Sequence, residues 1–229
     1  MKKILIALLS ITIISSAFAL SSCSCKSETP LEVGETVAPD FNDNGISYNK
    51  NDDGTLKVVC VDDAEEIIIP ESYNGMEITK IGRSSFKMSD VKKVVFPDTI
   101  TEIEDFAFSF SSELSEVKLN EGITSIGTNA FSGCKSLKSI ELPSTLDYIG
   151  LFSFDGSGLE NVVIPKNVKT VDEYAFAECS GLNEVTFEGT KTTIAENTFS
   201  SSFNVSIVAK KNSEVIKTAK SESIPYTTK

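Results

Sequence analysis

Residues 122–142, with the sequence GITSIGTNAFSGCKSLKSIEL, hold the pattern that decides the fold of this chain. The pattern recurs from Ile67 to near the C-terminus, and its clearest marker is a small residue followed by phenylalanine. Successive marker phenylalanines are 22 or 23 positions apart, and the six are Phe86, Phe108, Phe131, Phe154, Phe176 and Phe199. A fixed period of this length predicts a solenoid, in which each repeat buries its apolar face only by stacking on its neighbours.

Two further apolar positions keep a constant distance from each marker phenylalanine. A β-branched residue stands five positions before it, as Ile126 does before Phe131, and an apolar residue stands five or six positions after it, as Leu137 does. A short alternating run follows in five copies: Val94-Val95-Phe96, Val117-Lys118-Leu119, Ile140-Glu141-Leu142, Val162-Val163-Ile164 and Val185-Thr186-Phe187. Alternation predicts a strand whose first and third residues face inward. We therefore expect a mainly β solenoid of about six repeats, each 22 or 23 residues long.

The order of residues within the repeat resembles a known family. Leu137-x-x-Ile140-x-Leu142 has the strand pattern of leucine-rich repeats. The strand ends at a proline in four copies, Pro70, Pro97, Pro143 and Pro165. Strand, proline, Ile-Gly, Ala-Phe, Cys and Leu together resemble the bacterial BspA-like leucine-rich repeat family of cell-surface proteins over residues 44–226. The resemblance implies a surface-exposed binding protein, with adhesion or host interaction as its role.

The composition divides the chain into five segments. Residues 1–22 form a basic start and an apolar core typical of a secretory signal, and residues 23–44 are rich in polar residues and predict a flexible tether. Residues 45–66 contain two alternating runs around Asp53-Gly54, which predicts a β-hairpin that caps the solenoid. The repeats occupy residues 67–204. Residues 205–229 predict a last strand and a short helix capped by Asn212 or Ser213.

Two cleavage sites compete at the end of the signal segment. Ala17-Phe18-Ala19 suits an ordinary signal peptidase, whereas Leu20-Ser21-Ser22-Cys23 has the form of a lipobox, which places an acylated cysteine at the mature N-terminus. We favour the lipobox, because Cys23 directly follows the apolar core and two small residues. The expected protein is therefore an exported lipoprotein, anchored at the bacterial cell surface through lipid on Cys23.

Composition argues against several classes of function. The full chain has a formal charge of −12, and removal of Lys2 and Lys3 with the signal takes it to −14, which disfavours nucleic acid and anionic lipid headgroups as partners. The chain has no histidine, so triads of the Ser-His-Asp or Cys-His kind are impossible. We expect no metal site, no cofactor and no catalytic residue. A glycosidase that relies on two carboxylates stays open as a less favoured alternative.

Three cysteines lie within the folded part of the sequence. Cys134 and Cys179 hold the same position in repeats separated by one copy, so they should be roughly 10 Å apart. This distance exceeds the reach of a disulfide, and we expect both to be small buried residues. The sequence leaves open whether Cys60 is paired.

The outward residues of the strand runs form the expected recognition surface, as in other solenoids. Lys118, Glu141 and Val163 lie on the three middle repeats and are the candidate partner-binding residues, for a protein or a glycan. Cross-strand charge pairing among Glu116, Lys118 and Glu141 is the plainer alternative. The aromatic residues outside the apolar columns, Phe110, Tyr148 and Tyr174, serve either packing or binding. A structural envelope lipoprotein without an external ligand remains the alternative function.

Overall fold

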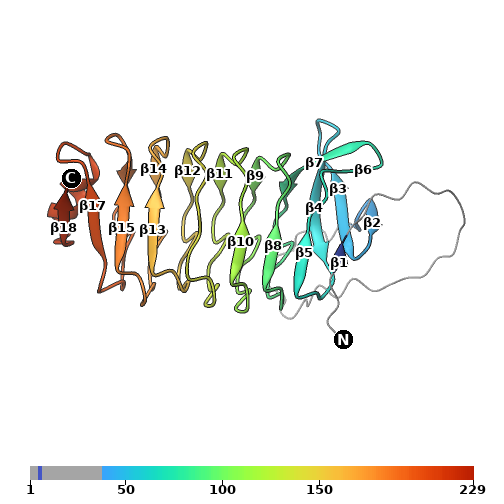
Figure 1. Cartoon of the computed structure of the whole chain (residues 1–229), viewed down its shortest axis with the longest axis horizontal. Coiled ribbons are helices and arrows are strands. Elements are labelled where there is room, and N and C mark those ends of the chain that lie inside the picture. Colours follow the sequence, from blue (N-terminus) through green and yellow to red (C-terminus); the bar gives the residue numbers. More distant parts are fainter. Residues whose placement is uncertain (1–4, 7–37) are drawn as a thin grey trace, which may run out of the picture.

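The computed structural model describes residues 5–6 and 38–229 and forms an elongated solenoid, in which each repeat is one turn, called a rung below (Figure 1). The mainly β solenoid predicted from the sequence is confirmed. Apart from Leu5 and Ile6, the expected signal peptide, the lipidation site Cys23 and most of the expected tether lie outside the described residues.

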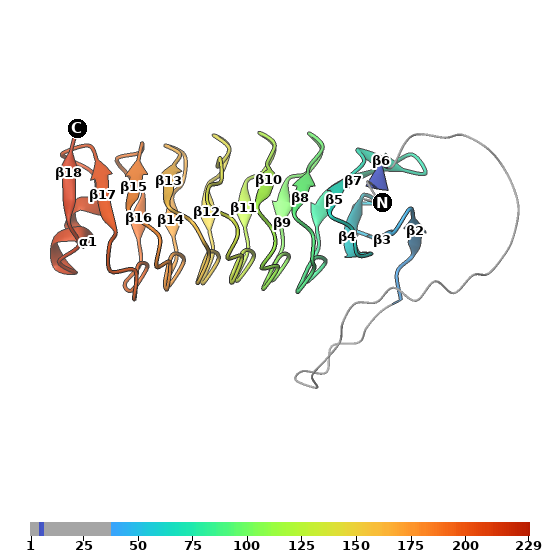
Figure 2. The same ribbon diagram turned by 60° about the horizontal axis from the view of Figure 1, so that its bottom comes forward.

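Two columns of short parallel strands run along the long axis (Figure 2). The first column consists of β5 (Glu66–Ile68), β8 (Lys93–Val95), β10 (Glu116–Lys118), β13 (Asn161–Ile164), β15 (Glu184–Phe187) and β17 (Ser206–Ala209). The second column consists of β7 (Met76–Ile81), β9 (Glu102–Ile103), β11 (Ser125–Ile126), β12 (Tyr148–Ile149), β14 (Thr170–Val171) and β16 (Thr193–Ile194). Strand β1 (Leu5–Ile6) pairs in parallel with β5.

The register of the strands follows the sequence repeat. Val94 lies opposite Val117, and Val162 lies opposite Val185, so equivalent residues of successive repeats are neighbours. The first column is interrupted once: β10 pairs with β8 and β13 pairs with β15, but the expected strand at Ile140-Glu141-Leu142 between them is not a strand. The rung with the best match to the sequence pattern is therefore the irregular one.

The N-terminal cap is an antiparallel sheet of three strands, β2 (Phe41–Asp43), β3 (Ile46–Lys50) and β4 (Leu56–Val61), and β6 (Ser72–Tyr73) pairs with β7. The predicted hairpin of β3 and β4 is confirmed. Strand β2 lies in the segment that the sequence assigned to the tether. The reason is Asn44-Gly45, where both residues have positive φ (49° and 78°) and connect Asp43 to Ile46, the geometry that favours a two-residue hairpin turn.

The C-terminal cap contains the predicted strand and helix. Helix α1 (Val215–Ser221) buries Val215, Ile216 and Ala219 against the last rung. The predicted caps Asn212 and Ser213 were wrong, because the N-cap is Glu214 and makes no side-chain cap hydrogen bond. A further strand, β18 (Tyr226–Thr228), was not expected and pairs in parallel with β17.

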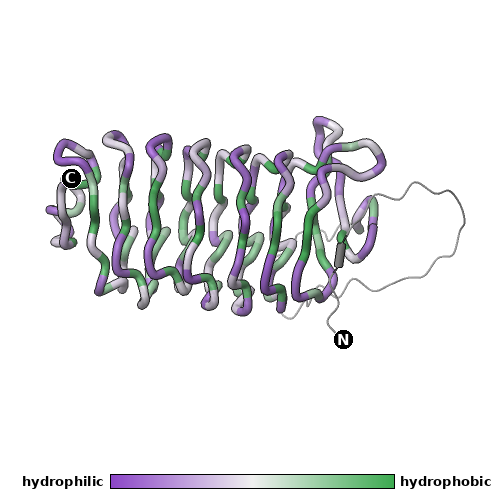
Figure 3. Tube along the Cα trace, in the orientation of Figure 1, coloured by the Kyte–Doolittle hydropathy of each residue, from purple (hydrophilic) through white to green (hydrophobic). Residues whose placement is uncertain are grey.

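The marker phenylalanines form one buried stack along the solenoid, and their exposed fractions are 6% or less. Centroids of successive rings are 4.5 to 5.8 Å apart. From the second marker onward, the carbonyl of the small residue before each phenylalanine accepts a hydrogen bond from the phenylalanine amide of the preceding rung, as Ser153 does from Phe131 at 2.7 Å. Apolar segments recur from rung to rung with hydrophilic segments between them (Figure 3).

A second buried column follows the phenylalanine stack and consists of hydroxyls and thiols. Cys134 and Cys179 are fully buried and free, as predicted. Their thiols donate to the carbonyls of Phe108 and Phe154 in the preceding rungs, at 3.2 and 3.1 Å. Ser202 donates to Phe176 in the same way at 2.8 Å. Serine and cysteine alternate at this position because either can satisfy that carbonyl.

Candidate functional site

The outward side chains of the first strand column form the candidate site, called the strand face below. Inward residues of these strands are buried, as Val94, Ile164 and Phe187 are at 0% exposure, whereas outward Val163 is 50% exposed. The predicted alternation between inward and outward residues is therefore confirmed. A half-exposed valine on a central rung offers apolar contact area that no other part of the described chain covers.

Charge pairing occurs on the strand face, but not among the residues expected. Lys93 is the central cation, with its Nζ 3.5 Å from Glu66 and 3.3 Å from Glu116, and the hydrogen bond to Glu116 raises the pKa of Lys93. Within residues 38–229, Lys118 and Glu141 take part in no ion pair. Both side chains are exposed. Of the three residues for which charge pairing between strands was the alternative, only Glu116 is paired, and Lys118 and Glu141 are not.

The structure brings two of the three candidates together. Glu141 and Val163 both line a pocket of about 370 Å³ on the strand face, whereas Lys118 is not part of its lining. Three further acidic residues line this pocket. Glu184 is an outward residue of β15, as the alternation predicts, whereas Glu121 and Glu188 were not predicted for this face. Glu121 and Glu188 stand at or just after the strand ends, where the sequence pattern gave no reason to expect a side chain on the same surface as Glu141.

The second strand column carries another polar surface. Tyr148 donates from its hydroxyl to Asp172 at 2.8 Å, and partial burial together with this hydrogen bond raises the pKa of Tyr148 to about 12. Tyr148 also lines a pocket of about 470 Å³ with Arg83 and Asp105. The carboxylate of Asp105 accepts the amide of Thr128 at 2.8 Å, so it has a partner within the fold.

Aromatic residues also occupy turn positions with positive φ, where glycine is usually favoured. Phe106, Phe152 and Tyr174 have φ values of 57°, 54° and 56°, in the left-handed region that is uncommon for bulky side chains. The rings of Phe152 and Tyr174 stack with centroids 4.8 Å apart, and the Arg83 guanidinium lies 5.2 Å from the Phe106 ring. Phe110, by contrast, is 56% exposed. Of the aromatic residues raised by the sequence, Tyr148 and Tyr174 therefore have packing or hydrogen-bond partners, and Phe110 presents its ring to solvent.

Some further properties concern only the described residues. No group of three or more acidic or cysteine side chains among them is arranged to hold a metal ion. No helix in residues 38–229 has the length and apolar character needed to cross a membrane. Cys60 is disulfide-bonded.

A family model of the BspA-type leucine-rich repeat region matches residues 79–206 in six copies. This chain belongs to the BspA-type leucine-rich repeat family. The six matched copies agree with the repeat count that the phenylalanine spacing predicted. Comparison with curated protein sequences gives no match.

Solved structures support the same architecture. A leucine-rich repeat protein from Bacteroides ovatus is 30% identical with a TM-score of 0.66, and the match covers 74% of this chain and 47% of that protein. The leucine-rich repeat protein of T. pallidum is 25% identical with a TM-score of 0.62, over 64% of this chain and 70% of that one. The pneumococcal vaccine antigen PcpA is 22% identical, with a TM-score of 0.65 over 81% of this chain and 48% of its own, and shows similarity of fold alone. This chain thus spans about half the length of the Bacteroides protein.

Proposed function

We propose that this BspA-type protein is an exported lipoprotein, anchored through Cys23 at the cell surface, and that it binds a macromolecular partner, a protein or a glycan, through the strand face. The observation that supports the proposal is the contrast along the strands: inward side chains are buried, whereas the side chains of Lys118, Glu141 and Val163 are exposed. Among the described residues, Lys118 and Glu141 form no ion pair. Solenoids bind through such extended surfaces. Adhesion or host interaction is the role that family membership favours.

The protein is proposed to have no catalytic activity of its own. A repeat period that stays at 22 or 23 residues leaves no insertion in which to assemble a preorganised site, and the chain has no histidine to act as a general base. Function in such a protein depends on surface residues and not on the fold itself. A purely structural envelope lipoprotein is the competing function, and it predicts that exposed residues of the strand face can be changed without consequence.

A capture experiment separates the two functions. The bait is the chain from residue 23 with Cys23→Ser, which lacks lipid, and the reversal variant carries K118E together with E141K. A matched control carries E173K and K191E, which also reverses one exposed acid and one exposed base. Neither Glu173 nor Lys191 lines the pocket that contains Glu141. We expect a partner that is retained by the wild type and the control and lost by the reversal variant. Equal retention by all three baits would favour the structural function.

A further inference from the structure

The first strand column is broken at the rung of residues 138–142. Strand β10 pairs only with β8 on one side, and β13 pairs only with β15 on the other. The amide of Glu160 still donates to the carbonyl of Lys138 at 3.0 Å, but the backbone groups of residues 139–142 make no backbone hydrogen bond with any described residue. The strand ladder is therefore interrupted at this rung, although the rung itself stays between its two neighbours (Figure 1).

The pocket that Glu141 and Val163 share lies at this break. Its lining includes Ile140 and Leu142 from the irregular rung and Pro165 from the next. Ile140 and Pro165 are largely buried, so the half-exposed Val163 and the partly exposed Leu142 provide the apolar surface on which an aliphatic chain can lie. No aromatic residue is part of the lining. A sugar ring would therefore have no aromatic face to stack on in this pocket.

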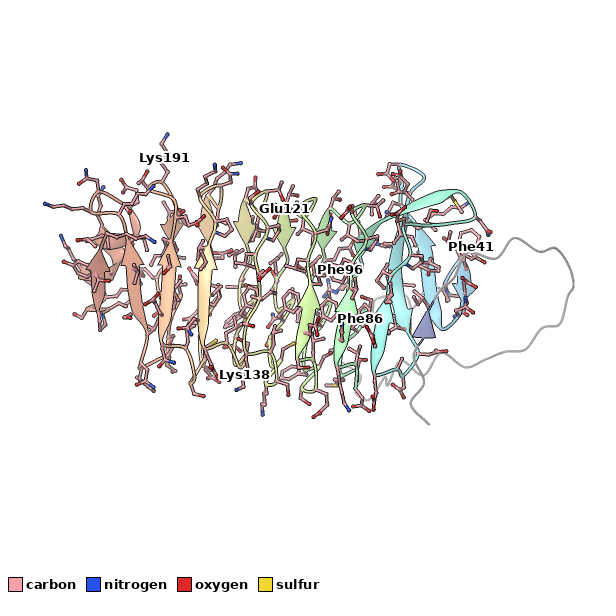
Figure 4. The ribbon with its side chains drawn as sticks, viewed as in Figure 1. Phe41, Phe86, Phe96, Glu121, Lys138 and Lys191 are labelled. Atoms are coloured by element: carbon pink, nitrogen blue, oxygen red, sulfur yellow. The ribbon has the colours of Figure 1, made fainter. Side chains whose placement is uncertain are left out.

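The charge around the pocket is of one sign. Four glutamates line it and no lysine or arginine does: the four are Glu121, Glu141, Glu184 and Glu188. Within residues 38–229 none of them forms an ion pair. The nearest lysine in sequence to Glu141, Lys138, lies at the opposite end of the rung from Glu121 (Figure 4). Among the described residues, the four carboxylates therefore have no lysine or arginine at ion-pair distance.

Two of these carboxylates are held in place. Glu121 accepts hydrogen bonds from the amide and the hydroxyl of Ser144, each at 2.8 Å, and Glu184 accepts one from the Thr186 hydroxyl at 3.0 Å. Glu141 and Glu188 are exposed and accept no side-chain hydrogen bond from the described residues. The pocket thus combines fixed and adjustable acceptors around an apolar floor, which suits a charged side chain with an aliphatic stem.

We propose that this pocket binds a basic segment of a protein partner, with an arginine or lysine whose stem lies on Val163 and Leu142 and whose charged head contacts the carboxylates. The proposal rests on the proposed function and names the partner class for the same face. An arginine can form charge-assisted hydrogen bonds with several of the carboxylates. A lone metal ion is disfavoured, because the described acids do not form a metal-binding group.

The test uses two labelled synthetic peptides, each about nine residues long, built from Ser and Val with either two Arg or two Glu. Fluorescence anisotropy measures their binding to the Cys23→Ser chain at about 50 mM and about 300 mM NaCl. We expect the Arg peptide to bind, more weakly at the higher salt, and the Glu peptide not to bind. E141Q with E184Q should weaken binding at least about fivefold, since it removes two of the four pocket charges.

A matched variant controls for the negative charge of the whole protein. E113Q with E173Q removes two exposed acids that do not line the pocket, and it should change the affinity less than about twofold. Thermal unfolding followed by circular dichroism confirms that both variants are folded. Equal weakening by the two pairs would show attraction by overall charge and would overturn the proposal.

The remaining outcomes separate this inference from the proposed function. If the Arg peptide does not bind, yet the K118E and E141K reversal still abolishes capture of a partner, the strand face binds but its partner is not a basic segment. Displacement of the partner by a neutral oligosaccharide would have the same meaning and would identify a glycan. If neither the peptide nor the reversal has any effect, both proposals fail together.

Discussion

The rings of Phe131 and Phe154 lie face to face in the core, with centroids 5.3 Å apart and 5° between their planes. Both side chains are fully buried. The same contact joins every pair of neighbouring rungs from Phe86 to Phe199. Each of the four inner rings is therefore packed between two others, and a change at one of these rungs affects the contacts on both sides.

Removing a central ring should destabilise the whole stack. Phe131→Ala is expected to lower the free energy of unfolding by about 3–5 kcal/mol, because it loses buried apolar area and leaves a cavity between two rings. Phe203→Ala is the matched control, since Phe203 is 91% exposed and should change the value by less than about 0.5 kcal/mol. Urea unfolding followed by circular dichroism measures both. A loss below about 1 kcal/mol for Phe131→Ala would contradict the role of the stack.

The buried thiols should make the folded state less stable at alkaline pH. Burial raises the pKa of Cys134 to about 12 and that of Cys179 to about 11, from an ordinary value of 9.0. The folded state holds the two thiol protons more tightly than the unfolded state does. The stabilisation that the protonated thiols give the folded state is therefore complete below pH 9.0 and is lost as the pH rises toward 11 and 12. The C134S and C179S double variant keeps hydroxyl donors at both positions but does not titrate. We expect urea unfolding to show a steeper loss above pH 9.0 for the wild type than for the variant, and equal slopes would refute this account.

Much of the fold could be predicted because every rung buries the same positions of the repeat. The period alone placed Ile126, Phe131 and Leu137 in the core, and each is fully buried. Apart from the missing strand at residues 140–142, the errors occurred where the repeat ends. Strand β2 depends on the local turn at Asn44-Gly45, and the cap of helix α1 depends on tertiary contacts, such as the hydrogen bond from the Glu214 amide to the Thr190 carbonyl at 3.0 Å. Local and tertiary details of that kind leave no periodic signal.

The candidate site was only partly predictable. Alternation correctly placed Glu141 and Val163 on the outward face, but it could not show that the strand would be absent at their rung or that residues from strand ends would join them. Glu121, for example, is brought to the pocket by its hydrogen bonds with Ser144, one repeat further along the chain. Contacts between adjacent rungs therefore decide the site, and a motif within one repeat does not contain them.

Lipid on Cys23 should determine where the protein is found. The Cys23→Ala variant is expected to leave the membrane fraction, because a cysteine is required for acylation of the lipobox. Cell fractionation with immunoblotting measures the distribution, and protease added to intact cells shows whether the solenoid is exposed. Wild-type protein that begins at Leu20 and is soluble would contradict the anchor. Protection from protease would favour the structural envelope function.

The disulfide of Cys60 gives a second test of the anchor. The chain has five cysteines, Cys60 is disulfide-bonded, and Cys134 and Cys179 are free. If lipid occupies Cys23, the cysteine that remains for Cys60 is Cys25, and we expect a non-reduced peptide map to join peptides that contain these two. Cys25→Ser should make Cys60 reactive to alkylation. A bond between Cys60 and Cys23 would instead exclude acylation of Cys23.

Binding through the strand face is the central claim, and the affinity of a captured partner tests it most directly. Biolayer interferometry would compare the wild type, the K118E and E141K reversal and the E173K and K191E control, with each variant shown to be folded by its thermal transition. We expect the reversal to weaken binding at least about tenfold, because exposed charges set complementarity with the partner, while the control stays within about twofold of the wild type. An affinity of the reversal variant within about twofold of the wild type would show that the recognition surface lies elsewhere, with the Tyr148 side the next to examine.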